Sequence, residues 1–210
     1  MTDFSSLVAT LMQSRQTILP KRLLSPGPDA LQLSMILGAA ASAPDHGQLV
    51  PWRFILVPAT ARGLLADQFA SALVERDTEA LAEQVEQARE KAYRAPLLLL
   101  VVVDGARGDA SVDLHERIVS AGCAVQNMLL MATSLGYGSA LTSGKALKSQ
   151  GLRSLFALAA QEHALCFVSV GTVQSRKPQR SRPTPADYVA HLTVAQGVVS
   201  GLPLQELPTE

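Results

Sequence analysis

The stretch that decides the fold is IVSAGCAVQNMLLMATSLGYGS, residues 118–139. Apolar side chains occupy almost every side of a helix over 118–130, and the surrounding pattern predicts one helix over 112–135, the longest in the chain. Gly136 and Gly138 follow its end, where we expect left-handed backbone. A helix that is apolar all round needs cover on every face, so we expect it at the centre of the molecule or of a dimer.

Apolar segments of strand length lie on both sides of this helix in the sequence. LLLLVVV, residues 97–103, is apolar throughout, which predicts a strand buried on both faces. Shorter strands are expected at 53–57 and 164–171, and a short segment, 139–142, leads from the long helix toward the next one. Helices are expected at 4–14, after a cap at Asp29, and at 59–76, 77–93 and near 148–158. Because the order lacks regular βαβ alternation, the predicted fold class is α+β.

The composition indicates one globular domain over residues 1–210, with a basic tail from about residue 174. Hydrophobic residues make up 48% of the chain and charged residues 17%, and the formal net charge is zero. Surfaces for nucleic acids or membranes usually carry a basic excess, so we expect neither partner. The mean hydropathy of +0.19 suggests that part of the apolar excess lies at a subunit interface.

The start of the chain, its most apolar run and its cysteines all bear on the expected cellular location. Asp3 stands where a secretory signal would carry positive charge, and no small-residue cleavage site follows it. Polar residues interrupt the most apolar run, 118–135, which favours a buried helix over a membrane span. Cys123 and Cys166 lie in apolar segments and lack CxxC spacing. We therefore expect both to be buried free thiols in a reducing compartment. We therefore expect a cytoplasmic protein.

Several motifs with known chemistry are absent from the sequence. There is no GxGxxG after a strand, no GxxxxGK[ST], no HExxH and no GxSxG. The four histidines are scattered without metal-ligand spacing, and the adjacent His115 and Glu116 would point in different directions. We expect no metal site, and no catalytic triad.

Three segments, in this order along the chain, resemble the nitroreductase family, especially its small members with an Ala-Pro-Asp-His turn. They are SRQT (14–17), APDHGQLVPWRF (43–54) and SAGCAVQNMLLMATSLGYGS (120–139). The resemblance implies a mainly antiparallel central sheet flanked by helices. It also implies a homodimer built around the long helix, with two FMN molecules at the interface, each touched by both chains.

By this resemblance, the flavin is held by residues from four parts of the chain. They are Arg15 at the phosphate end with Gln16 and Thr17 after it, Ser42 and His46 presented to the partner's flavin, Leu141, Thr142 and Ser143 beside the ring, and Arg180 and Arg182 in the basic tail. A phosphate needs cations or helix N-termini, which suits the three arginines. Asp45 is interpreted as a turn hydrogen-bonder and Trp52 as a core anchor.

Two of these segments depart from the family pattern. Relatives often read Arg-Arg-Ser where this chain has Arg15–Gln16–Thr17, so one cation is missing. Close relatives often read Trp-Arg-Ser where this chain has Leu141–Thr142–Ser143. The second change removes an aromatic ring and a positive charge from beside the flavin, and bears on flavin affinity and on the choice of substrate.

The function implied by the resemblance is a ping-pong oxidoreductase. NAD(P)H passes hydride to FMN, and a small acceptor such as a nitroaromatic or a quinone then takes two electrons from the same face. The flavin would carry the chemistry, so no catalytic side chain is assigned. Two alternatives stay open: a flavin-binding sensor or storage protein with little turnover, and a flavin-free dimeric interaction module. Either NADH or NADPH could serve as the donor.

Overall fold

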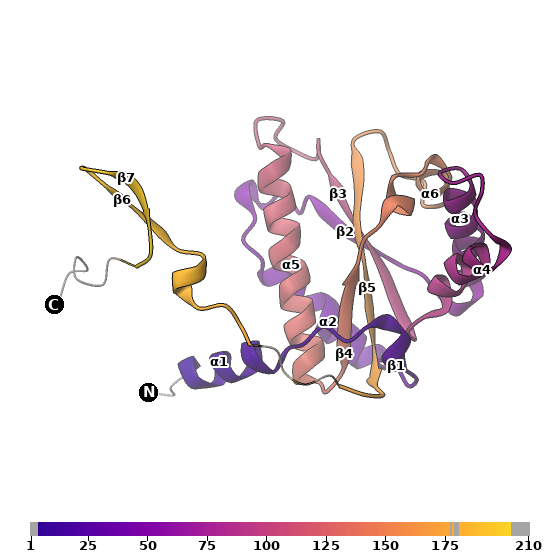
Figure 1. Cartoon of the computed structure of the whole chain (residues 1–210), viewed down its shortest axis with the longest axis horizontal. Coiled ribbons are helices and arrows are strands. Elements are labelled where there is room, and N and C mark those ends of the chain that lie inside the picture. Colours follow the sequence, from indigo (N-terminus) through magenta and orange to yellow (C-terminus); the bar gives the residue numbers. More distant parts are fainter. Residues whose placement is uncertain (1–3, 177, 179–180, 203–210) are drawn as a thin grey trace. The chain divides into compact units, whose positions relative to one another are not determined.

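Five antiparallel strands form the sheet around which the fold is built (Figure 1). The computed structural model describes residues 4–176, 178 and 181–202. The strand order is β1–β5–β3–β2, and β4 also pairs with β5. The strands are β1 (Leu23–Leu24), β2 (Trp52–Leu56), β3 (Leu97–Asp104), β4 (Gly138–Thr142) and β5 (Glu162–Val173). The expected α+β class, with an antiparallel sheet flanked by helices, is confirmed.

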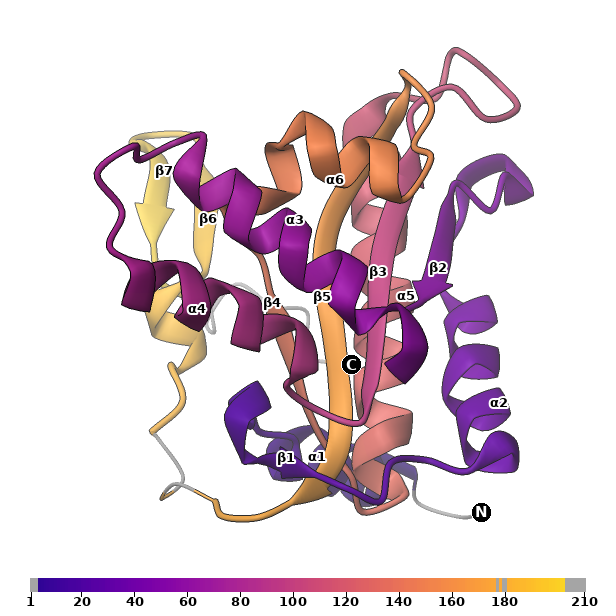
Figure 2. The same cartoon turned by 90° about the vertical axis from the view of Figure 1, so that its right-hand side faces the viewer.

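Helices cover both faces of this sheet (Figures 1 and 2). One face carries α2 (Ala30–Ala39) and the long helix α5 (Leu114–Ser134), and the other carries α3 (Arg62–Val74), α4 (Ala82–Glu90) and α6 (Gln150–Leu155). The first helix of the chain, α1 (Phe4–Ser14), has no buried residue.

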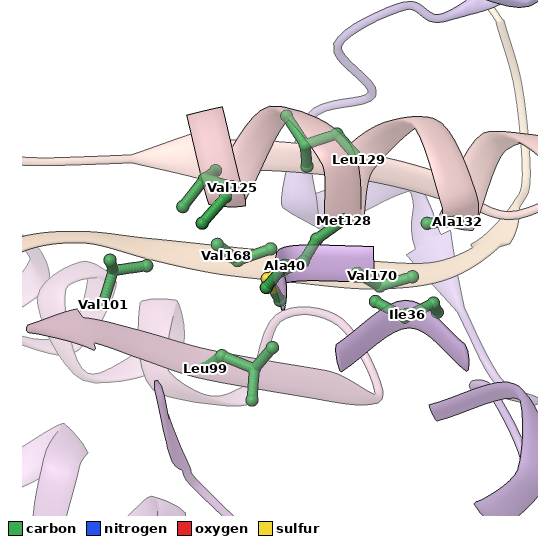
Figure 3. Packing of buried hydrophobic residues seen from close by; sticks show 11 residues of the cluster. Ile36, Ala40, Leu99, Val101, Val125, Met128, Leu129, Ala132, Val168 and Val170 are labelled. Atoms are coloured by element: carbon green, nitrogen blue, oxygen red, sulfur yellow. The ribbon is translucent and has the colours of Figure 1, made fainter. Parts of the chain in front are cut away.

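The central strand β3 serves both layers, because successive side chains of a strand point to opposite faces. Leu99 and Val101 pack with α2 and α5, and Leu98, Leu100 and Val102 pack with the other layer. Figure 3 shows Leu99 and Val101 facing the side chains of α2, α5 and β5. The whole segment 98–103 is buried, as the continuous apolar run predicts.

The long helix is covered on one side only. Its buried residues include Ala121, Ala124, Val125 and Met128, which face the sheet. Ile118 is 37% exposed and Val119 is 65% exposed. The cover that the sequence predicts for every side of this helix is therefore incomplete within one chain.

The helix ends follow local rules that the sequence reveals in part. Asp29 caps α2 as predicted: its carboxylate accepts from the Gln32 backbone N–H at 2.8 Å, and the Gln32 side chain accepts from the Asp29 N–H at 3.0 Å. Gly136 has a positive φ of 86°, as predicted. Gly138 does not, and the expectation for it was wrong: a Cβ there would lie 2.6 Å from Val173 Cγ2, so the glycine is required by close packing.

The long helix is shorter than predicted by three residues, and three further helices are shorter as well. Residues 59–61 and 91–93 form single 3-10 turns beside α3 and α4, and residues 77–81 lie outside both helices. Asp77 there accepts from the Glu79 N–H at 3.2 Å, a local bond that competes with helix formation. The third helix, α6, begins after a Ser149 cap and ends before Ala157, which has a positive φ of 47°.

The chain divides into two compact units between Arg176 and Lys177. The second unit contains a 3-10 turn, Pro185–Asp187, and a hairpin of β6 (Ala190–Thr193) and β7 (Gly197–Ser200). These two strands, each only four residues long, are not among those predicted from the sequence. The prediction of one domain over 1–210 with a basic tail stays a prediction.

Candidate functional site

Two cavities lie beside β4, and the same two chain segments, 15–20 and 139–147, contribute to both. The smaller one, here called the α5 cavity, has a volume of about 210 Å³ and lies between β4 and α5. Its lining consists of Arg15, Thr17, Gln126, Leu129, Ser139, Ala140 and Leu141. This cavity therefore joins the first and third of the segments that the sequence analysis singled out.

The larger cavity, here called the α3–α4 cavity, has a volume of about 490 Å³. Side chains of α3, α4 and β5 line it, together with residues 142–147 and with Leu19 and Pro20. Phe69, Leu98 and Phe167 form part of its apolar wall, and the rings of Phe69 and Phe167 meet edge to face at 5.7 Å. Small-molecule sites usually have volumes of this size and walls of this kind.

Packing against β4 holds the segment that carries Arg15. The Ile18 N–H donates to the Ser139 carbonyl at 2.9 Å, and Thr17 forms a parallel bridge with Ser139. Gly138 makes this approach possible, because a Cβ there would lie 2.9 Å from Ile18 Cγ1 and 2.8 Å from Leu23 Cδ2. The backbone therefore places Arg15 and Thr17 at the mouth of the α5 cavity.

One polar atom beside the α5 cavity lacks a partner. The Ser139 hydroxyl is buried and makes no hydrogen bond with any residue that the structure describes. Buried hydroxyl groups are normally satisfied, because leaving one unpaired costs about 1–3 kcal/mol. Together with Arg15 and Thr17, this hydroxyl gives the cavity the polar character that a ligand with a phosphate and hydroxyl groups requires.

The structure brings together five of the ten predicted site residues. Arg15, Thr17 and Leu141 line the α5 cavity, and Thr142 and Ser143 line the α3–α4 cavity. The lining passes from one cavity to the other between Leu141 and Thr142, at the end of β4.

Three of the other five predicted residues lie away from both cavities. Gln16 is half-buried and lines neither cavity, and the same holds for the exposed Ser42 and His46. Arg182 belongs to the second compact unit. Arg180 lies outside the described residues.

The Ala-Pro-Asp-His turn is held by two polar contacts. Asp45 accepts from the Val50 N–H at 2.6 Å, which confirms its interpretation as a turn hydrogen-bonder. His46 Nδ1 lies 2.8 Å from Glu116 Oε2 near the start of α5. This hydrogen bond, reinforced by the carboxylate charge, raises the pKa of His46 above its usual 6.5. The next segment packs inward: Trp52 donates to Ser120 at 3.1 Å and contacts the core, as predicted.

Sequence reasoning missed a group of cations at the larger cavity. Arg76, Lys91, Arg94 and Lys145 line it and come from three places in the chain, so no single spacing pattern connects them. It also missed Gln126 and Ser139, although both lie within the quoted stretch, and the helical position of Gln126 on an apolar segment was a usable signal.

Within 4–176, 178 and 181–202, the histidines, cysteines and carboxylates form no group able to hold a metal ion. Burial raises the pKa of Cys166 to about 11, which keeps this thiol protonated and unreactive near neutral pH. None of the described helices is long and apolar enough to cross a membrane.

Known proteins that are similar to this chain in sequence and in structure are nitroreductases or nitroreductase-like proteins. The model of the Nitroreductase family matches residues 13–172. A Haemophilus influenzae protein named "Putative NAD(P)H nitroreductase" is 33% identical over 184 residues, which cover 87% of this chain and 98% of that protein.

Two solved structures share the fold. The nitroreductase-like family protein from Bacillus cereus superposes with a TM-score of 0.75 at 17% identity, covering 90% of this chain and 97% of the other. A nitroreductase with bound FMN from Bacteroides fragilis gives a TM-score of 0.66 at 20% identity, covering 89% and 98%. These matches confirm the nitroreductase-like fold that the sequence motifs implied.

Proposed function

The chain belongs to the nitroreductase family, and on that premise we propose that it is an FMN-dependent oxidoreductase. It takes electrons from NAD(P)H and passes them to a nitroaromatic, a quinone or a similar small acceptor. The donor and the acceptor use the same site in turn, in a ping-pong sequence. We place the reaction in the cytoplasm, where NAD(P)H is available and free thiols such as Cys123 and Cys166 stay reduced.

The observation that carries this proposal is the polar lining of the α5 cavity beside a larger cavity with an apolar wall. Arg15 supplies a cation for the FMN phosphate, and Thr17 supplies a hydroxyl. The unpaired Ser139 hydroxyl offers a further polar partner. These residues fit the phosphate and ribityl end of FMN. Leu141, Thr142 and Ser143 run from one cavity to the other and would contact the ring.

When bound, FMN supplies the redox chemistry, accepting a hydride from the donor and delivering two electrons to the acceptor. The protein's residues bind and orient the reactants. The apolar wall with Phe69, Leu98 and Phe167 excludes water from one side of the α3–α4 cavity and offers a surface for a flat acceptor. The described part of this lining includes no histidine or carboxylate, so we expect water to supply the acceptor's proton.

We further propose that two copies of the chain form a homodimer around α1 and α5. On α1, Phe4 is 65% exposed and Leu7 63%, and on α5 Val119 is 65% exposed. Exposed apolar residues grouped on helices commonly mark interfaces. In the second unit, Leu192 and Val198 of the hairpin are exposed as well. Ser42 and His46, which line neither cavity, would then reach the flavin of the second subunit.

The dimer is tested by adding charge to this apolar surface. Val119→Glu should give a monomer by light scattering after size-exclusion chromatography, because the carboxylate would be desolvated in the interface. Leu64→Glu, on an exposed position of α3, is the matched control and should leave the mass unchanged. A Val119→Glu protein that keeps the dimer mass would contradict the assignment.

The flavin site is tested by the visible absorption spectrum of the purified protein, before and after addition of excess FMN and desalting. We expect about one flavin per chain and rapid bleaching by NADH or NADPH. Bound flavin with negligible NAD(P)H oxidation across several acceptors would favour the sensor or storage protein. A colourless protein that retains no FMN would contradict the enzyme and the sensor alike, and would favour the flavin-free dimeric interaction module.

The phosphate assignment has its own test. Arg15→Gln should weaken FMN binding by roughly tenfold or more, the usual effect of losing a hydrogen bond to a charged group. Arg107→Gln removes an exposed arginine from a loop that lines neither cavity, and should bind FMN as the unchanged chain does. Equal FMN affinity in all three proteins would refute the role of Arg15.

A further inference from the structure

The α3–α4 cavity combines an apolar wall with a cationic rim. Arg76, Lys91 and Lys145 line it and are exposed, and Arg94 is half-buried. Among the residues that the structure describes, no aspartate or glutamate lines the cavity. The four cations thus give its opening a formal charge of +4, in a chain whose formal net charge is zero.

These cations are largely uncompensated. Arg94 lies 4.0 Å from Glu90, an exposed pair one helical turn apart, and such pairs contribute little. Among the described residues, no ion pair links Arg76, Lys91 or Lys145 to a carboxylate. Like charges around one opening repel each other and lower the stability of the fold, so an anion in the cavity would relieve this repulsion.

The opposite wall of the cavity is apolar and would bind an uncharged part of a ligand. Leu98, Leu147 and Phe167 are buried, and Phe69 and Leu73 are half-buried beside them. A flat aromatic ring would cover this surface and remove apolar area from water. An aromatic ring that carries an anionic group satisfies both parts of the lining.

Resting on the proposed function, we propose that the α3–α4 cavity selects aromatic anions as electron acceptors, with the ring on the apolar wall and a carboxylate or sulfonate at the cationic rim. The flavin phosphate has its own cation, Arg15, in the α5 cavity. The rim cations are therefore available to the acceptor.

The test compares two acceptors of almost equal shape, 4-nitrobenzoate and its neutral amide, 4-nitrobenzamide, with the FMN-loaded protein. Lys145→Gln should lower kcat/KM for 4-nitrobenzoate by about 2- to 5-fold, the range for one exposed charge pair, and leave the amide unaffected. Arg76→Gln combined with Lys145→Gln should enlarge this loss. For the unchanged protein, raised salt should lower kcat/KM for 4-nitrobenzoate and leave kcat/KM for the amide unchanged.

Lys148→Gln is the matched control. Lys148 ends the same 3-10 turn that Lys145 begins, it is exposed, and it does not line the cavity. It should therefore keep the kcat/KM values of the unchanged protein. Because each acceptor is compared with itself across variants, the intrinsic reactivity of the two compounds cancels.

Two outcomes would overturn the inference while the proposed function stands. One is an equal loss for both acceptors, or none, in the Lys145 and Arg76 variants. The other is weakened FMN retention in these variants with an unchanged preference between acceptors, which would assign the rim to the flavin phosphate. If the protein shows no turnover, calorimetry decides: Lys145-dependent binding of 4-nitrobenzoate over the amide supports the inference, and equal binding overturns it.

Discussion

The two faces of the central sheet are built from the same strands and yet differ in kind. On the face covered by α2 and α5, Leu99 and Val101 pack against Ile36 and Met128, all at most 1% exposed (Figure 3). On the other face, Leu98 borders a cavity of about 490 Å³. Around Leu99 and Val101 the packing is closed, whereas beside Leu98 it is hollow. The difference teaches that adjacent residues of one apolar strand can serve stability and binding separately.

Truncation of neighbouring leucines should measure this difference most directly. Leu99→Ala should lower the free energy of unfolding by about 3–5 kcal/mol, because it leaves a sealed void in the closed layer. Leu98→Ala should cost less, about 2–3 kcal/mol, because the lost volume joins an existing open cavity. Urea unfolding of both variants gives the two values, and equal losses would show that the layers are packed alike.

Gly138 sharpens the comparison at the edge of the sheet. Gly138→Ala should cost about 1–3 kcal/mol, because its Cβ would lie 2.6 Å from Val173 Cγ2 and 2.8 Å from Leu23 Cδ2. Gly38→Ala is the control, since a Cβ on this glycine of α2 meets nothing within 4 Å. It should instead add about 0.5–1 kcal/mol, the helix-propensity difference between glycine and alanine. A stabilised Gly138→Ala protein would mean that this edge is loosely packed.

On the hollow face, the ion pair of Arg53 and Glu162 makes the free energy of unfolding depend on pH in the acid range. Arg53 Nε donates to Glu162 Oε1 at 2.6 Å and Nη2 to Oε2 at 2.9 Å, and these bonds lower the pKa of Glu162 below its usual 4.5. The stabilisation is therefore full above pH 4.5 and is lost as the pH falls through the lowered value. Because Arg53 is partly exposed, we expect about 1 kcal/mol.

Arg53→Met should remove this part of the pH dependence. Unfolding followed at pH 7 and at pH 3 should show a smaller difference in the variant than in the unchanged protein. The same difference in both proteins would assign the acid sensitivity to other carboxylates.

The smallest effect is expected at His46. Its pKa is raised by Glu116, so the pair stabilises the fold below about pH 6.5, and that contribution fades as the pH rises through the raised value. An NMR titration should place the pKa of His46 above 6.5, and Glu116→Gln should return it toward that value. Asp113→Asn, which alters the carboxylate beside His115, should leave it in place.

Much of this architecture could be predicted from apolar periodicity. The helix at Phe4–Ser14 was predicted to the residue, and strand β3 differs from its prediction only by Asp104 at its end. Long periodic segments carry their own structural signal. The two-residue strand β1 carries none, because Leu23 and Leu24 are a strand only through pairing with Thr172 and Val173.

The candidate site divides in the same way. Arg15, Thr17 and Leu141 came from family motifs, and the structure brings them to one cavity. The cations of the larger cavity could not be predicted, because Arg76 and Lys145 are distant in sequence and meet only through the packing of α3 and the segment after β4. Motifs report positions that families share, whereas the lining of a cavity depends on the tertiary fold.

Arg62, on α3, has a consequence for how the hollow layer opens. Its buried guanidinium donates to the carbonyls of Val57 at 2.8 Å, Ala92 at 2.6 Å and Pro96 at 3.3 Å, and burial lowers its pKa. Three segments thus share one donor group, so none can separate without leaving a buried charge poorly solvated. The start of α3, the turn after α4 and the entry to β3 should therefore exchange their amide protons together, as a single cooperative unit of local unfolding.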